Sequence, residues 1–66
     1  MEIVLNGTSL TLPDDCTVAA LLQHQQLAQR RVAVEVNGAI VPHGLHPEQR
    51  LVPGDRVEIV HALGGG

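Results

Sequence analysis

The first twelve residues alternate apolar and polar side chains around an Asn-Gly pair. Residues 3–5 and 8–12 are rich in β-forming side chains, and Asn6-Gly7 lies between them. Asn-Gly favours a two-residue type I′ turn, because both central positions need a positive φ. In that register the apolar side chains share one face: Met1, Ile3, Leu5, Leu10 and Leu12. The pattern predicts a hairpin with one face toward a core and Val4 on the other.

Residues 17–26 have the spacing of a short amphipathic helix. Val18, Leu21 and Leu22 follow the i, i+3, i+4 rule and form one apolar stripe. Thr17 suits the N-cap position, and two aspartates just before it favour the positive end of the helix dipole. A polar run of glutamines and one histidine ends the helix near residue 26.

A second strand, Asn-Gly, strand pattern covers residues 32–41. Three valines alternate there with Ala33 and Glu35, so the glutamate side of this strand faces solvent. A two-residue loop at Asn37-Gly38 places Ile40 on the same face as Glu35.

The chain from residue 42 to residue 55 is irregular, with three prolines and a turn signal. Pro47 suits the first position of a helix, so we expect one helical turn to begin there. Pro53-Gly54-Asp55 predicts a turn into the last strand, residues 56–61. Alternation within that strand places Val60 on the outer face.

These elements predict an α+β fold of the β-grasp (ubiquitin-like) class, with the order ββαββ and an irregular stretch before the last strand. A helix between an early hairpin and a late strand can join the first and last strands in parallel by a right-handed crossover. We expect a mixed sheet of four to five strands packed on one helix. We expect residues 1–66 to form a single domain, with 62–66 as a flexible C-terminal glycine tail.

The parallel pairing of the first and last strands is expected to make Val4 and Val60 neighbours on the outer face, and Ile40 extends this apolar cluster. An exposed apolar cluster beside the tail would suit docking of partner proteins. β-branched residues on a solvated face can equally reflect strand propensity alone. The sequence does not choose between these two interpretations.

Composition narrows the class of function. The chain has 66 residues, 44% of them hydrophobic and none aromatic, which predicts one small domain with an aliphatic core. A net charge of -3 argues against nucleic acid or an anionic membrane as partner. The single cysteine excludes an internal disulfide, and no membrane span or signal peptide is recognised. We expect a cytoplasmic protein that is not an autonomous enzyme.

Cys16 and the four histidines are the side chains with reactive or metal-binding chemistry. Cys16 precedes the helix, where a thiolate could be stabilised, but free cysteine is commonly a small buried hydrophobe and we expect that role. The histidines show no zinc-ligand spacing, so no metal site is expected. His61 lies close to the tail and could help a partner to orient it, although a strand-end surface residue is the plainer interpretation.

The chain ends in three glycines. Gly66 carries an α-carboxylate, and a peptide without side chains can thread a narrow channel. Activation as an acyl-adenylate would turn this carboxylate into an acyl donor, and attack by sulfur would then give a thiocarboxylate. A frayed end is the alternative interpretation.

The chain resembles the bacterial ThiS family, the sulfur carriers of thiamine biosynthesis, over nearly its whole length. The resemblance rests on the hairpin at Asn6-Gly7, on Thr17-Val18 with Leu21-Leu22, on residues 33–38 with 40–42, on residues 54–61 and on the Gly-Gly end. It implies that Gly66 is the thiocarboxylate site and that no cofactor is bound. An E1-like adenylyltransferase (ThiF type) would use ATP, a cysteine desulfurase would supply sulfur, and a thiazole synthase (ThiG type) would accept it.

The residues expected to contact these partners are Leu63, Gly64, Gly65, His61, Val4, Val60 and Ile40. Two rival carriers share the fold and the tail: the small subunit of molybdopterin synthase and a ubiquitin-like modifier. The former tends to be longer, with aromatic and proline residues near its tail, which this chain lacks. The absence of lysine for chain building argues mildly against the latter. An interaction module with an inert tail is a further alternative.

Overall fold

The computed structural model describes residues 1–61, and the predicted tail, residues 62–66, lies outside this part. The described residues form five strands, one α-helix and one short 3-10 helix. In chain order these are β1 (Glu2–Leu5), β2 (Thr8–Thr11), α1 (Val18–His24), β3 (Val32–Val36), β4 (Ala39–Val41), η1 (His43–Leu45) and β5 (Arg56–His61).

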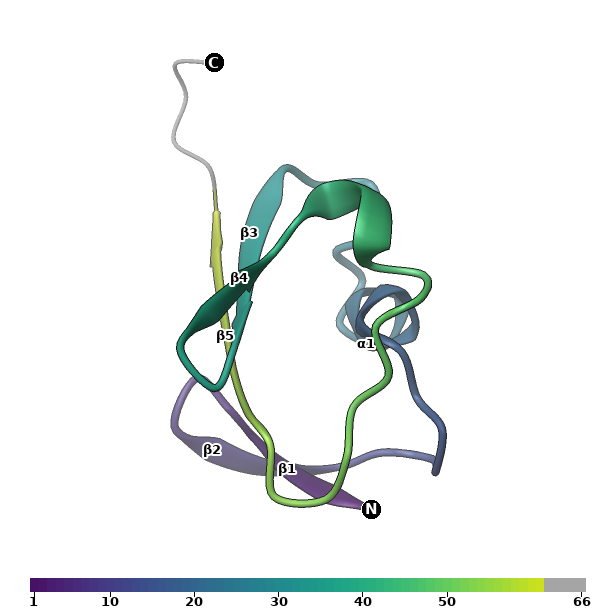
Figure 1. Ribbon diagram of the computed structural model, residues 1–66, viewed down its shortest axis with the longest axis vertical. Helices are drawn as coiled ribbons and strands as arrows, with labels where there is room; N and C mark the ends of the chain where they lie inside the picture. The colour runs from purple at the N-terminus through teal and green to yellow at the C-terminus, as the bar shows by residue number, and fades with distance from the viewer. Residues whose placement is uncertain (62–66) are drawn as a thin grey trace.

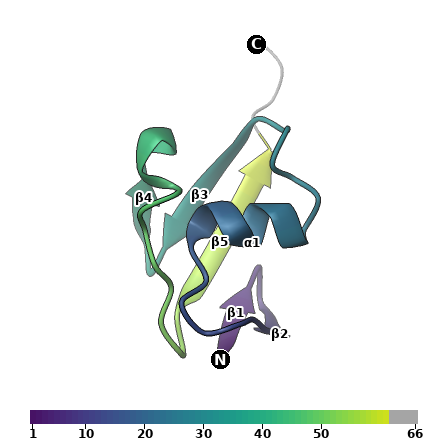
Figure 2. The same cartoon turned by 90° about the vertical axis from the view of Figure 1, so that its right-hand side faces the viewer.

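The strands form one mixed sheet in the order β2-β1-β5-β3-β4, with β5 at its centre (Figure 1). β5 pairs in parallel with β1 and antiparallel with β3. Helix α1 lies across one face of this sheet (Figure 2). The predicted mixed sheet on one helix is confirmed, although three strands follow the helix where the order ββαββ counts two. The seven-residue helix, the one α-helix of residues 1–61, is too short to cross a membrane.

Both Asn-Gly pairs form the predicted turns. Asn6 and Gly7 have φ values of 49° and 85°, and Asn37 and Gly38 have 52° and 86°. Positive φ at both central positions is the requirement of a type I′ turn, which matches the twist of the flanking strands. The resulting registers pair Ile3 with Leu10 in the first hairpin and Glu35 with Ile40 in the second, as predicted.

The N-terminus of α1 is closed by its own cap and by a distant loop. The Thr17 hydroxyl accepts a hydrogen bond from the backbone three residues on, at 3.1 Å, which confirms the predicted N-cap. Two more first-turn amides donate to loop carbonyls: Val18 to Gln49 at 2.9 Å and Ala19 to His46 at 3.0 Å. The first four amides of a helix lack intrahelical partners, and the loop carbonyls accept hydrogen bonds from two of them.

The core between the sheet and α1 is aliphatic, as the composition predicts. Its buried residues are Ile3, Leu12, Cys16, Val18, Leu21, Leu22, Val34, Val36, Val41, Leu51, Val57 and Ile59. The predicted helix stripe is wholly buried, and so is the inward face of β5. The partly buried Leu27 packs against this core.

The helical turn after the second hairpin lies earlier than predicted. It begins at His43, directly after Pro42, where the sequence favoured Pro47. The Leu45 amide donates to the Pro42 carbonyl at 2.9 Å, and this bond fixes the turn. Pro47 lies in the following turn instead.

His46 lies in the irregular segment before β5 and is buried. Its Nε2 atom lies 3.2 Å from the Val41 carbonyl oxygen. The buried ring therefore has a polar partner at the end of β4, and the loop is held against the second hairpin. A buried polar group needs such a partner, because leaving it unpaired costs stability.

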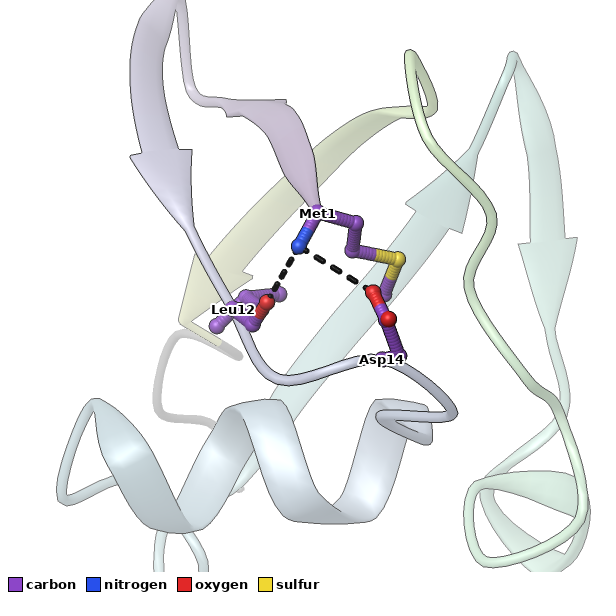
Figure 3. Close-up of polar contacts among 3 residues, drawn as sticks. All are labelled: Met1, Leu12 and Asp14. Atoms are coloured by element: carbon purple, nitrogen blue, oxygen red, sulfur yellow. Dashed lines mark hydrogen bonds and ion pairs between the residues drawn. The ribbon is translucent and has the colours of Figure 1, made fainter.

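Met1, at the start of the first hairpin, contacts the residues that follow β2 (Figure 3). The Met1 ammonium group donates to the Leu12 carbonyl at 2.6 Å and lies 3.3 Å from a carboxylate oxygen of Asp14. The partner carboxylate is largely exposed, so the ion pair contributes little beyond the backbone contact.

The turn before β5 is fixed by the buried carboxylate of Asp55. Its two oxygens accept from the side-chain amide of Asn37 and from the backbone amide of Val52, each at 2.9 Å. The side-chain oxygen of Asn37 in turn accepts from the Arg56 amide at 3.0 Å. This network joins the second hairpin to the start of the central strand.

Replacing Asp55 with Ala should lower the free energy of unfolding by about 1–3 kcal/mol, because two part-buried hydrogen bonds to its carboxylate are lost. Urea unfolding of the Asp55→Ala variant measures this loss. Glu48→Ala, which removes an exposed carboxylate from the preceding loop, is the control and should unfold like the parent. Equal midpoints for the two variants would contradict the role assigned to Asp55.

Candidate functional site

Strand β5 carries the core on one face and presents the other face to solvent. Val57 and Ile59 are buried, while Arg56, Glu58 and Val60 are exposed. The alternation predicted for this strand is confirmed. His61, at the end of this strand, is the last residue that the structure describes.

Four of the predicted site residues, Leu63, Gly64, Gly65 and Gly66, lie outside the described residues. The structure therefore leaves the expected thiocarboxylate site unplaced. His61 is exposed at the end of β5 and pairs with Val32 across β3. His61 is therefore a surface residue at the end of a strand, which was the plainer of its two interpretations from the sequence.

The predicted contact between Val4 and Val60 is wrong. The parallel register pairs Val4 with Arg56, and Val60 lies four residues farther along β5, opposite Ala33. At about 3.3 Å per residue, the two valines are separated by roughly 13 Å along the strand. Val4 is also half-buried, whereas 59% of Val60 is exposed.

The outer face beside Val60 holds five residues, of which the sequence grouped Ile40 with Glu35 and with Val60 but not the others. Glu35 on β3 lies opposite Ile40 on β4 and opposite Glu58 on β5. One step along the same face, Ala33 lies opposite Val60. We call these five residues the β3–β5 patch. Alternation alone places each of them outward, but the strand order is needed to make them neighbours.

Cys16 lies in the core, with 5% of its surface exposed. Burial raises the pKa of its thiol, so the reactive thiolate is disfavoured. Its Sγ atom lies 3.5 Å from the Thr17 carbonyl oxygen. The predicted packing position is confirmed.

The histidines of the described chain do not assemble into a metal centre. The rings of His43 and His46 lie 5.1 Å apart and are tilted by 49°. Nowhere in residues 1–61 do three or more histidine, cysteine, aspartate or glutamate side chains gather at a spacing that could hold a metal ion.

The chain is similar to part of two longer curated proteins. It is 39% identical over 66 residues to a thiazole synthase of Paramagnetospirillum magneticum and 38% identical over 66 residues to one of Magnetococcus marinus. All of this chain is covered in both cases, and it spans 20% of the length of each relative.

Solved structures match the whole chain. A crystal structure of the thiamine biosynthesis protein ThiS from Geobacter metallireducens has a TM-score of 0.86 and 30% identity, with both chains fully covered. A solution structure of a thiamine biosynthesis protein from the same organism has a TM-score of 0.80 and 30% identity, and 88% of that chain is covered. The ThiS family matches residues 2–66. The chain therefore belongs to the ThiS family.

Proposed function

We propose that the α-carboxylate of Gly66 carries the sulfur. An E1-like adenylyltransferase joins this carboxylate to the AMP part of ATP and releases pyrophosphate. The terminal sulfur of a persulfide supplied by a cysteine desulfurase then attacks the acyl carbon and displaces AMP, which gives an acyl disulfide. A second thiol attacks the other sulfur of this disulfide, which releases the thiocarboxylate and leaves a disulfide between the two thiol groups. The observation that carries this proposal is the match to ThiS over the whole chain, together with three terminal glycines.

In this proposal the carrier supplies only the carboxylate, and the partner enzymes supply the reactive groups and the ATP. Cys16 is buried and its thiol is disfavoured as a thiolate, so the domain itself offers no nucleophile at this position. ATP is used by the adenylyltransferase, and the carrier holds no cofactor of its own. Leu63, Gly64 and Gly65 form the part of the chain that enters the partner, because a segment of glycines can pass where side chains cannot.

Thiazole synthase is the proposed acceptor of the sulfur. Two curated proteins of that name contain a segment similar to the whole of this chain, within proteins about five times as long. In each of these relatives, a segment similar to this chain is part of the same polypeptide as the rest of the thiazole synthase. A separate carrier of the same family is therefore expected to bind such an enzyme. This inference supports a thiazole synthase partner for the present chain.

The proposed contact surface for these partners is the outer face of the sheet. Val60 and Ile40 are its exposed apolar side chains, and His61 lies beyond Val60 on the way to the tail. Val4 belongs to the same face and marks its far end beside Arg56. A partner that binds here lies next to the strand from which the tail follows.

Intact mass spectrometry tests the carrier function. After incubation with ATP, the adenylyltransferase and a sulfur source, one oxygen should be replaced by sulfur, and fragmentation should place the change on Gly66. Deleting Gly66 or adding an alanine after it should abolish the product without changing the thermal melt. Equal thiolation of the extended protein would contradict the proposal.

Cys16→Ala should still accept and transfer sulfur, because the thiol packs in the core. The variant should lose stability on the order of 1 kcal/mol. In the parent, iodoacetamide should label Cys16 about tenfold or more slowly than in urea-unfolded protein at the same neutral pH, because burial disfavours the thiolate. A folded Cys16→Ala variant that cannot carry sulfur would assign the thiol a chemical role.

Val60→Arg should weaken binding to the adenylyltransferase or to thiazole synthase by about tenfold, or ~1.4 kcal/mol, while the thermal melt changes little. Val52→Arg is the matched control, since Val52 is 56% exposed in the loop before β5 and lies off the sheet. Isothermal titration calorimetry of both variants decides the point. Equal affinities for the two arginine variants would exclude Val60 from the contact.

A further inference from the structure

The side chain of Asn6 continues the parallel pairing of β1 and β5 beyond the end of β1. Along the two strands, the Val4 amide donates to the Asp55 carbonyl and the Asn6 amide donates to the Val57 carbonyl, each at 2.9 Å. Bonds in a parallel ladder are evenly spaced, so Ile59 is the next residue of β5 whose backbone groups point toward this side. By then β1 has ended, because the chain turns at Asn6 with a φ of 49°.

The Asn6 side chain supplies both partners that Ile59 would otherwise lack on this side. Its Oδ1 atom accepts from the Ile59 amide at 2.9 Å, and its Nδ2 group donates to the Ile59 carbonyl at 3.3 Å. A side-chain amide carries one carbonyl and one NH2 group, so it can take the place of a peptide group on the neighbouring strand. The turn itself does not require these bonds, since glycine adopts a positive φ without steric cost.

These two bonds are the last hydrogen bonds that the first hairpin makes to β5 within residues 1–61. Beyond Ile59, the register partners of β5 in the described chain lie on β3, opposite Val60 and His61. Without the Asn6 side chain, the end of β5 would therefore be hydrogen-bonded along one edge instead of two.

We propose that Asn6 is a positioning residue for the sulfur-carrying end of the chain: its side chain fixes the end of β5 from which the adenylyltransferase takes Gly66 into its active site. This inference rests on the proposed function, which places the acyl chemistry on Gly66. The enzyme has to hold the body of the carrier and the terminal carboxylate at the same time. Each residue that is loose before binding has to be ordered in the complex, at a cost in conformational entropy. A fixed strand end leaves fewer of the seven residues after Ile59 to be ordered.

Asn6→Gly tests the proposal, because it keeps the turn and removes both bonds to Ile59. In a pyrophosphate-release assay at saturating ATP, the KM of the adenylyltransferase for this carrier should rise about fivefold or more, while kcat stays close to the parent value. By NMR, the Ile59 amide should also exchange its hydrogen faster, because it has lost its acceptor.

Asn37→Gly is the matched control. Asn37 occupies the same position in the second turn, with a φ of 52°, and its side chain binds Asp55 and the Arg56 amide at the opposite end of β5. This variant should lower the melting temperature at least as much as Asn6→Gly and leave the KM close to the parent value, at an assay temperature well below both melts. A merely structural role for Asn6 would make the KM follow stability. Equal rises in KM for the two glycine variants would therefore overturn the proposal.

Asn6→Asp separates the two bonds and takes the place of Asn6→Gly if the glycine variant does not fold. Its carboxylate can accept from the Ile59 amide but has no group to donate to the Ile59 carbonyl, so its KM should lie above the parent value and below that of the glycine variant. An Ile59 amide that exchanges as slowly in Asn6→Gly as in the parent would overturn the part given to the two bonds. Faster exchange with an unchanged or lower KM would overturn the positioning role.

The two measurements separate this inference from the proposed function. Hydrogen exchange at Ile59 needs no partner enzyme and reports on the two bonds alone. A parent that is adenylated and thiolated with the same KM as Asn6→Gly overturns the positioning role and leaves the carrier function standing. A parent that releases no pyrophosphate and gains no sulfur overturns the carrier function, and the positioning role with it.

Discussion

Strand β5 joins two hairpins that do not pair with each other. β1 and β2 form one hairpin, β3 and β4 form the other, and only β5 hydrogen-bonds to both. The helix lies against the sheet, and the inward side chains of β5, Val57 and Ile59, belong to the core beneath it. Among the described residues, β5 is therefore the strand on which both the sheet and the core depend.

The two asparagines that form the hairpin turns also bind β5. The side chain of Asn6 accepts from the Ile59 amide at 2.9 Å and donates to the Ile59 carbonyl at 3.3 Å. The side chain of Asn37 connects to Asp55 and to the Arg56 amide. A glycine could adopt the same positive φ, but it would lose these contacts. The same two asparagines therefore form the hairpin turns and hold the hairpins to the last strand and the turn before it.

Local patterns sufficed to predict the hairpins and the helix, because Asn-Gly turns, alternation and the stripe after Thr17 all act over a few residues. These local patterns could not predict the offset between Val4 and Val60. That register is set by long-range bonds, such as the Val4 amide to the Asp55 carbonyl at 2.9 Å. A single histidine in an irregular segment gives no periodic signal, so the burial of His46 was missed as well. The pairing of Glu35 with Glu58 needed the strand order for the same reason.

The parallel pairing of the first and last strands has a mechanical consequence. A pull on the C-terminal end, resisted at the first hairpin, would slide β5 along β1 rather than peel it away. The backbone bonds from Val4 to Asp55 and from Asn6 to Val57, and the side-chain bonds of Asn6 to Ile59, would then be strained together instead of one after another. Shear of this kind resists force better than unzipping. An enzyme that draws the end of the chain into a narrow channel would meet a domain that stays folded while it is held.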